Sequence, residues 1–169
     1  MRSQGRNTLI SALFVLFGGP GFVLVYVPFA ITRFRLPAHE PLWQIAVACA
    51  LVLLGLIPLF ESIVRFVRVG RGTLAPTAPT ERLVVNGLYR YVRNPMYVGV
   101  TVSLIGEALL FRSDGLLIFL AAGCLAMHLF VCLYEEPALT RRFPEQYPDY
   151  QSGVPRWLPR FTPWRGLAE

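Results

Sequence analysis

The chain has 169 residues, of which 54% are hydrophobic and only 15% are charged. Soluble domains carry about 25% charged residues, so this composition excludes a disordered chain and argues against a water-soluble monomer. The net charge is +6, and all 16 basic residues are arginines. These arginines lie between long apolar runs, which is typical of a membrane protein and gives no reason to expect nucleic acid as a partner.

Four apolar stretches are candidates for crossing a bilayer, which takes about 20 residues of helix. They predict an all-α fold, a polytopic membrane bundle of about four transmembrane helices in a single domain over residues 1–169. The predicted spans cover residues 8–31, 43–60, 96–111 and 116–134. The run Gly18-Gly19-Pro20-Gly21 inside the first span predicts a kinked helix or, alternatively, a helical hairpin that returns to the same side.

The pattern continues beyond these spans in a way that predicts how they are joined. The second span runs on as an amphipathic helix to Arg68, with one face in water. A tight turn at Arg112-Ser113-Asp114-Gly115 joins the third and fourth spans, so we expect them to form an antiparallel hairpin. The small residues Gly99, Ser103 and Gly106 predict close helix packing on the third span.

Several groups inside the spans have an ordinary structural interpretation. We expect Glu107 to have a structural role near the far end of the third span, although an ionisable residue in a span is also a functional hypothesis. His128 is interpreted as a histidine of the bundle core or as the partner of Glu107. The three cysteines form no CxxC motif and their number is odd, so the sequence predicts neither a disulfide framework nor a metal site. They are Cys49, Cys124 and Cys132.

The orientation of the spans follows from the arginines. Thirteen of them lie at the N-terminus, between the second and third spans, or in the C-terminal tail, and three lie on the opposite side, namely Arg33, Arg35 and Arg112. This asymmetry predicts that both termini are cytoplasmic and that the number of spans is even. We expect an integral protein of a bacterial inner membrane.

Two segments outside the spans are longer than simple connections require. Residues 70–95 are rich in turn formers, and residues 135–169 form a cytoplasmic helix followed by a proline-rich tail. We expect the fourth helix to continue to about Phe143 and to be broken by Pro144 and Pro148. The tail suits a simple interfacial anchor, with Trp157 and Trp164 among arginines. The aromatic density around its tyrosines favours a cofactor-site segment instead.

The hairpin predicts that the two segments share one cytoplasmic mouth. Arg93, Asn94 and Tyr97 lead into the third span, while Glu135 and Glu136 close the fourth. Because the open ends of an antiparallel hairpin meet, these residues are expected to lie together. Opposite charges and aromatic rings at a dry boundary would make a cradle for a small zwitterion.

These residues carry a resemblance to a known family. The order of motifs resembles the integral-membrane methyltransferases, and most of all the isoprenylcysteine carboxyl methyltransferase family, with phospholipid methyltransferases as relatives. The likeness covers about Gly72 to Pro159. Its elements are Gly87-x-Tyr89-x-x-x-Arg93-Asn94-Pro95-x-Tyr97-x-Gly99, then Glu135-Glu136, then Phe143-x-x-x-Tyr147-x-x-Tyr150, then Val154-Pro155-x-x-x-Pro159.

The resemblance implies S-adenosylmethionine as the cofactor, held where the last two spans and the C-terminal segment meet. It also implies a lipophilic methyl acceptor that arrives laterally from the bilayer, among membrane lipids. The residues it implies for catalysis are Arg93, Tyr97 and Glu136. Those it implies for cofactor binding are Tyr89, Arg93, Asn94, Pro95, Tyr97, Gly99, Glu135, Glu136, Tyr147 and Tyr150, with Val154-Pro155-Arg156 as part of a lid.

Asn94 stands where the family most often has histidine, and asparagine cannot titrate near neutral pH. A proton-transfer role at this position is therefore excluded. A carboxylate acceptor, such as a prenylcysteine-like one, needs no base, whereas a phospholipid amine must first lose a proton. The predicted site contains no histidine, which favours an acceptor that needs no general base. Glu135 or Glu136 with a raised pKa could nevertheless serve as the base.

Two other functions are compatible with the pattern. One is an NADPH-dependent membrane reductase of the sterol-reductase type, which has a similar element before a late span. The short chain and the Glu135-Glu136 pair argue against it. The other is a membrane scaffold without catalytic activity.

Overall fold

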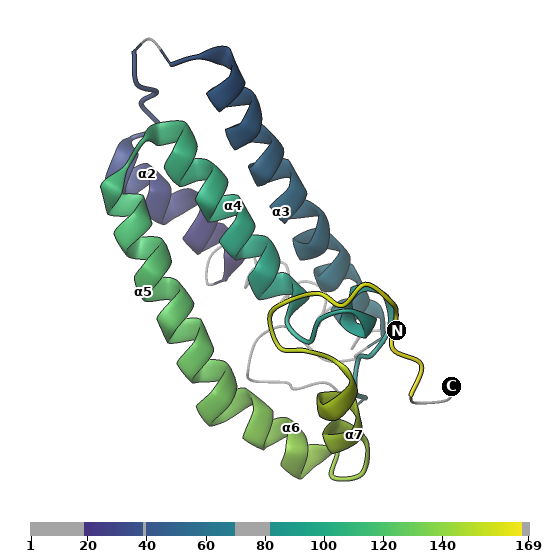
Figure 1. Cartoon of the computed structure of the whole chain (residues 1–169). Helices are drawn as coiled ribbons and strands as arrows, with labels where there is room; N and C mark the ends of the chain where they lie inside the picture. Colours follow the sequence, from purple (N-terminus) through teal and green to yellow (C-terminus); the bar gives the residue numbers. More distant parts are fainter. Residues whose placement is uncertain (1–18, 39, 70–81, 167–169) are drawn as a thin grey trace, which may run out of the picture.

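The computed structural model describes residues 19–38, 40–69 and 82–166, and for 66–69 only the backbone. The described residues form helices and no strand, in agreement with the predicted all-α fold. Helices α3 (Leu42–Val69) and α4 (Pro95–Phe111) lie side by side, while α5 (Asp114–Phe130) diverges from α4 with distance from the turn that joins them (Figure 1). Helix α2 (Val27–Thr32) contacts α5, and the π-helical turn before it, η2 (Phe22–Tyr26), contacts α4.

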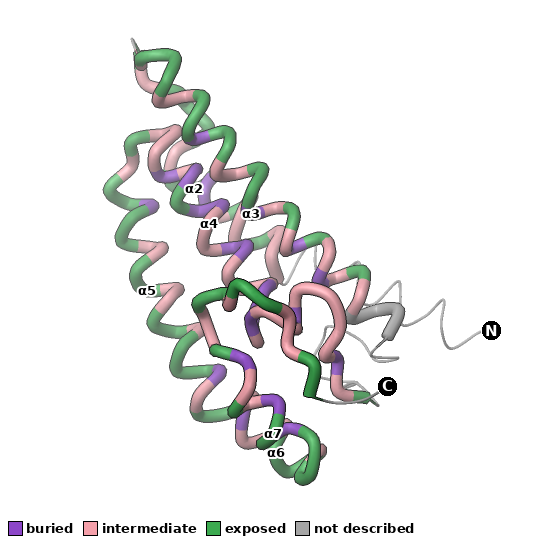
Figure 2. The backbone as a smooth tube through the Cα atoms, turned by 45° about the vertical axis from the view of Figure 1, so that its right-hand side comes forward, coloured by how far each residue is buried: buried purple, intermediate pink, exposed green. Residues whose placement is uncertain are grey.

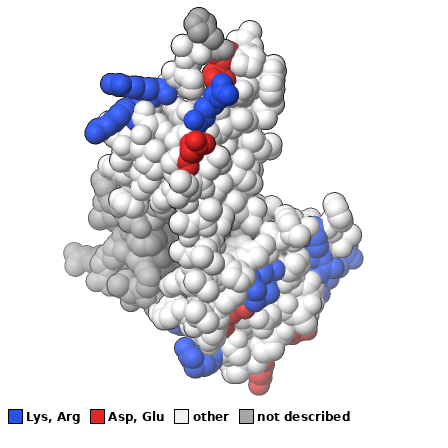
Figure 3. Space-filling view, turned by 60° about the vertical axis from the view of Figure 1, so that its left-hand side comes forward, with Lys and Arg blue, Asp and Glu red and all other residues white. Residues whose placement is uncertain are grey.

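Two of the described helices are long and apolar enough to cross a membrane, over Leu42–Arg65 and Asp114–Arg142. The segments Phe22–Thr32 and Pro95–Phe111 are also apolar but shorter. On the face shown in Figure 3, charged side chains gather toward the two ends of the molecule and leave an uncharged band between them. Residues 8–18 of the first predicted span lie outside the described residues, so the choice between a kink and a hairpin stays a prediction.

Small residues bring α3 and α4 together, as predicted. A Cβ atom on Gly99 would lie 2.5 Å from the carbonyl oxygen of Gly55, and one on Gly106 would lie 2.7 Å from that of Ala48. Ser103 is fully buried and donates a hydrogen bond to the carbonyl oxygen of Val52 at 3.2 Å. The small residues therefore let the backbones of α3 and α4 approach closely.

The hairpin between α4 and α5 also forms as predicted. Arg112 ends α4 in the left-handed conformation, with φ of 43°. Ser113 caps α5, because its hydroxyl accepts a hydrogen bond from the backbone nitrogen of Leu116 at 3.3 Å. The two helices therefore run antiparallel from a turn without any intervening loop.

The fourth predicted span continues as one helical rod beyond the apolar stretch. A π-helical turn, η4 (Val131–Glu135), leads directly into α6 (Glu136–Arg142), as the expected extension to about Phe143 requires. The prediction that Pro148 breaks the helix is wrong. Pro148 lies in the first turn of α7 (Gln146–Gly153), where a missing backbone N–H leaves no helical hydrogen bond unmade.

The buried side chains fall into two clusters. One lies between α3 and α4 and contains Leu59, Val100 and Leu104. The other lies beneath the C-terminal segment and contains Tyr147, Tyr150 and Val154. Figure 2 shows α5 as mostly exposed, with burial concentrated along α4 and around α7. The exposed apolar surface of α5 agrees with a helix that faces lipid.

Candidate functional site

The C-terminal segment after α7 folds back along the residues that lead into α4. It passes between α5 and the start of α4 in Figure 1. Three backbone hydrogen bonds of 2.9 Å and one side-chain bond of 3.2 Å hold it there. They run from Arg93 N to Pro155 O, from Arg160 N to Tyr91 O, from Trp164 N to Arg90 O, and from Asn94 Nδ2 to Arg156 O.

Glu136 fastens this segment from the other side. Arg156 donates to both of its carboxylate oxygens, at 2.7 and 2.8 Å, in a bidentate pair that raises the pKa of Arg156. Arg93 donates to the same carboxylate at 2.7 Å, and Gln151 donates at 3.1 Å. The side chain of Glu136 is only 9% exposed. Its oxygens are thus saturated by charge-assisted hydrogen bonds that join α4, α6 and the C-terminal segment.

Glu135 has a different environment, although it is the next residue. It accepts one hydrogen bond from the Tyr97 hydroxyl, at 3.3 Å. It belongs to the η4 turn, and such single π-helical turns are frequent at functional sites. The structure therefore brings Arg93, Tyr97, Glu135 and Glu136 to one mouth, as the hairpin predicts. Of the two glutamates, it is Glu136 whose oxygens are filled by protein donors.

The three predicted tyrosines outside α4 form a buried support. The Tyr150 hydroxyl donates to the Tyr89 carbonyl oxygen at 2.7 Å, and the Tyr147 and Tyr150 rings meet edge to face at 6.2 Å. Burial raises the pKa of all three hydroxyls above the usual value for tyrosine. Trp164 packs on Tyr150 with ring centroids 5.4 Å apart. These rings hold the C-terminal segment from beneath.

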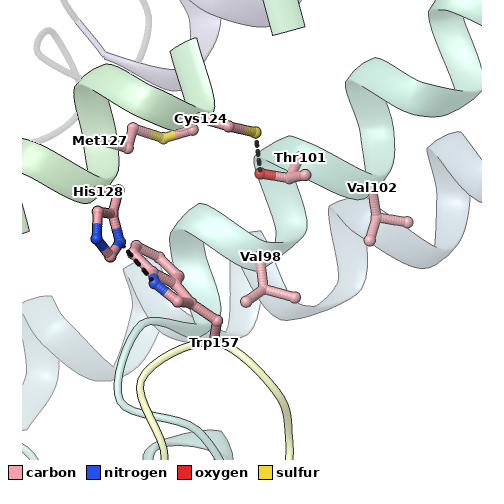
Figure 4. Close-up of a pocket in the computed structure, with 7 residues that line it drawn as sticks. All are labelled: Val98, Thr101, Val102, Cys124, Met127, His128 and Trp157. Carbon is pink, nitrogen blue, oxygen red and sulfur yellow. Dashed lines mark hydrogen bonds between the residues drawn. The ribbon is translucent and has the colours of Figure 1, made fainter. Parts of the chain in front are cut away.

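A cavity of about 340 Å³ lies between α4 and α5. Figure 4 shows Trp157, from the C-terminal segment, between α4 and α5 at one end of this cavity. The two helices contribute side chains at the same i, i+3, i+4 spacing. The lining residues are Val98, Thr101 and Val102 from α4, Cys124, Met127 and His128 from α5, and Trp157.

Trp157 and His128 lie together at one end of the cavity. The indole nitrogen of Trp157 donates to His128 Nδ1 at 3.2 Å, and the two rings lie 6.0 Å apart. The Trp157 ring also lies 6.4 Å from the Tyr97 ring, which connects the cavity to the Tyr97–Glu135 pair. Because indole N–H only donates, Nδ1 of His128 is the acceptor and its ring proton is on Nε2.

Several sequence-based expectations are corrected here. His128 bonds Trp157, not Glu107, and it lines the cavity about two turns before the glutamate pair. Among the residues that the structure describes, one buried oxygen of Glu107 has no hydrogen-bond partner. Trp157 contacts His128 and Trp164 contacts Tyr150, which a simple interfacial anchor, the less favoured interpretation of the tail, does not explain. The matched i, i+3, i+4 spacing on the third and fourth spans is the signal that could have indicated the cavity.

Three predicted cofactor residues have a clear structural role. Gly99 packs against Gly55 and Leu59 of α3, where no space for a ligand is left. Pro95 is the buried first residue of α4, a position that suits its fixed φ. Asn94 precedes it and uses its side chain to hold Arg156. These residues shape the mouth without lining the cavity.

Comparison with protein families gives one result that bears on this geometry. The model of the family described as phospholipid methyltransferase matches residues 43–146, which is more than half of the chain. The match includes α3, α4, α5 and the glutamate pair. No curated protein and no solved structure matches the chain. The chain belongs to the phospholipid methyltransferase family, and it is a membrane methyltransferase by that membership.

Proposed function

We propose that this protein transfers a methyl group from S-adenosylmethionine to a lipophilic acceptor that arrives from the bilayer. The observation that carries this proposal is the cavity between α4 and α5. It is lined by apolar side chains, ends at Trp157, and adjoins the polar Tyr97–Glu135 pair. An apolar chamber beside a few fixed polar groups suits a molecule with a lipid part and a reacting polar end.

The proposal includes the membrane arrangement. Four crossings within a single domain, both termini in the cytoplasm, and a bacterial inner membrane are part of it. The arginine asymmetry supports the orientation. The antiparallel α4–α5 hairpin supports an even number of crossings, since it returns the chain to the side on which Arg93 and Glu136 meet.

The residues at the mouth fit S-adenosylmethionine. Among the described residues, Arg93 Nε is a buried donor without a hydrogen-bond partner, so the Arg93 guanidinium has a position left for a carboxylate or carbonyl of the cofactor. Glu135 has oxygen lone pairs left for an ammonium or a ribose hydroxyl. The rings of Tyr97 and Trp157 present faces that attract a cation. When bound, the cofactor supplies a methyl group on a positively charged sulfur.

The side chains of the protein would then orient the bound molecules and shield them from water. Tyr97 and Glu135 orient the polar end of the site, and Trp157 excludes water from the cavity. Alignment of acceptor and donor is the main contribution such a site makes, and a dry environment strengthens the electrostatic interactions inside it. We propose that Glu136 holds the lid formed by Val154-Pro155-Arg156, and that Glu135, not Glu136, meets the cofactor, because Glu136 is already saturated.

The side chains that could act as a general base at the site indicate which class of methyl acceptor it suits. Asn94 does not titrate, and the Trp157 indole occupies the accepting nitrogen of His128. We therefore favour an acceptor that needs no base, such as a prenylcysteine-like carboxylate, over a phospholipid amine. An amine would need Glu135 as its base, or a His128 released from Trp157.

Two experiments test this function. Thermal unfolding in detergent is compared with S-adenosylhomocysteine and with NADPH, since a ligand stabilises the state that it binds. We expect a rise in melting temperature with S-adenosylhomocysteine alone. A rise with NADPH alone would favour the reductase, and no rise with either would favour the scaffold. Labelled methyl transfer into a total lipid extract of the host then identifies the acceptor.

A further inference from the structure

The C-terminal segment carries two apolar side chains that no part of the described protein covers. Leu158 is 80% exposed, and Phe161 is completely exposed. They follow Trp157, the residue that closes the cavity. Trp157 and Trp164, which the sequence offered as membrane anchors, contact His128 and Tyr150 instead.

These two side chains are presented by a fixed backbone. Arg160, between them, donates its backbone N–H to Tyr91 O at 2.9 Å and its guanidinium to Gly153 O. Trp164 N donates to Arg90 O a few residues later, also at 2.9 Å. An exposed phenylalanine held in this way keeps its apolar surface in the solvent unless something apolar receives it.

The depth of the segment indicates what receives it. Trp157 bonds His128, which lies two turns before Glu135 on the α5–η4 rod, about 10 Å at 1.5 Å per residue. That part of α5 presents exposed Leu125 and Leu129, the surface expected to face lipid. Leu158 is the residue after Trp157, whose side chain is held beside this apolar part of α5.

The arginines of the C-terminal segment agree with a position near the lipid headgroups. Arg160 is half-buried and Arg165 is exposed, and they stand one residue before and four residues after Phe161 in the sequence. Arginines beside inserted apolar residues suit the headgroup region, where their stems lie along apolar surface and their charged ends reach anionic lipid.

We infer that Leu158 and Phe161 form a lipid-inserting edge, which seats the C-terminal segment at the boundary between headgroups and acyl chains of the cytoplasmic leaflet. This edge lies directly beside the cavity that Trp157 closes, so the closing residue is anchored to the bilayer as well as to α5. The inference rests on the membrane location and on the cytoplasmic C-terminus proposed above, and it does not depend on the proposed methyl transfer.

The test introduces one tryptophan at a time into the full chain and measures its fluorescence. The protein is placed in vesicles of phosphatidylcholine whose acyl chains carry bromine, a quencher, close to the headgroup. Leu158→Trp and Phe161→Trp should each lose about half of the added emission to bromine, because an inserted indole lies within reach of the boundary. Ser152→Trp, at an exposed position on α7, is the matched control and should be quenched by iodide in the water and not by bromine.

Quenching of the new indoles by iodide and not by bromine would contradict the inference. Protection from both quenchers would also contradict it, since a protein partner would then cover the edge. A measurement on the unchanged chain guards against variants that fold poorly. A phospholipid with a photoreactive group in its acyl chain should label the tryptic peptides 157–160 and 161–165, and absence of label from both would overturn the inference.

Discussion

The two faces of α4 show how one helix serves both a permanent contact and an open site. Toward α3 it presents Gly99, Ser103 and Gly106, and the backbones touch across them. Toward α5 it presents Val98, Thr101 and Val102, and a cavity remains. The residues of the two sets alternate along the same turns of the helix. The rotation of α4 about its axis therefore determines which residues pack against α3 and which line the cavity.

The difference lies in what closes each face. Helix α3 lies against α4 along its length, whereas α5 diverges from α4 (Figure 1). Trp157 lies between α4 and α5 at one end of the cavity (Figure 4). The first face is closed by fixed backbone contacts and the second by a segment that Glu136 and His128 hold in place. We expect substitutions on the α3 face to change stability, and those on the α5 face to change binding and turnover.

The largest loss of stability is expected at the ion pairs that hold the C-terminal segment against α4 and α6. Glu136→Gln removes the charge that Arg93 and Arg156 share, and breaking a buried ion pair costs about 3–5 kcal/mol. We expect a lower melting temperature and loss of methyl transfer. Glu145→Gln, at an exposed position, is the control and should resemble the wild type. Equal melting temperatures for all three proteins would show that Glu136 does not fasten the segment.

A somewhat smaller loss is expected on the α3 face. Gly106→Leu places a side chain against the Ala48 carbonyl oxygen and Val52, and such overpacking costs about 1–3 kcal/mol. Val102→Leu, on the opposite face, adds volume where the cavity can receive it and should cost less than about 1.5 kcal/mol. Thermal unfolding measures the loss of stability in each of the two variants. Equal losses would show that the two faces of α4 are packed alike.

The next effect concerns the cofactor. Glu135→Gln removes a charge that the protein does not saturate, so we expect S-adenosylhomocysteine to bind about tenfold more weakly, or about 1.4 kcal/mol, with little change in stability. Calorimetric titration in detergent measures this dissociation constant. Binding equal to that of the wild type would mean that the Glu135 carboxylate has no part in the cofactor site.

The smallest effect is expected at the contact between Trp157 of the C-terminal segment and His128 of α5. Trp157→Phe keeps the ring and loses the hydrogen bond to His128, which contributes about 1 kcal/mol. His128→Leu should have the same effect, and the double variant should be no worse than either one. A double-mutant cycle on melting temperature measures this coupling. Additive losses would show that the two side chains act independently.

Local patterns predicted much of the fold. The apolar runs gave the extents of α3, α4 and α5 closely, and the small residues of α4 marked its α3 face. The Arg112–Gly115 turn required Arg93 and Glu136 to meet, which they do at 2.7 Å. Each of these features depends on residues that are near in sequence or related by one hairpin.

The course of the C-terminal segment could not be predicted in this way. It depends on hydrogen bonds between residues some 60 to 70 positions apart, such as Arg93 to Pro155 and Arg160 to Tyr91. Without that course, the sequence could not distinguish the saturated Glu136 from Glu135, nor reveal that Trp157 reaches His128. Pro148 was misread because its meaning depends on whether a helix ends or begins there.

If methyl transfer takes place at the cavity between α4 and α5, a side chain that fills this cavity should stop the reaction. Val98→Trp should occupy the cavity, while Leu125→Trp adds the same side chain at an exposed position of α5. Labelled methyl transfer from S-adenosylmethionine into a host lipid extract is measured for both. We expect Leu125→Trp to keep the wild-type rate and Val98→Trp to lose it by about tenfold or more, an increase of about 1.4 kcal/mol in the barrier. Equal rates in the two folded variants would contradict the claim.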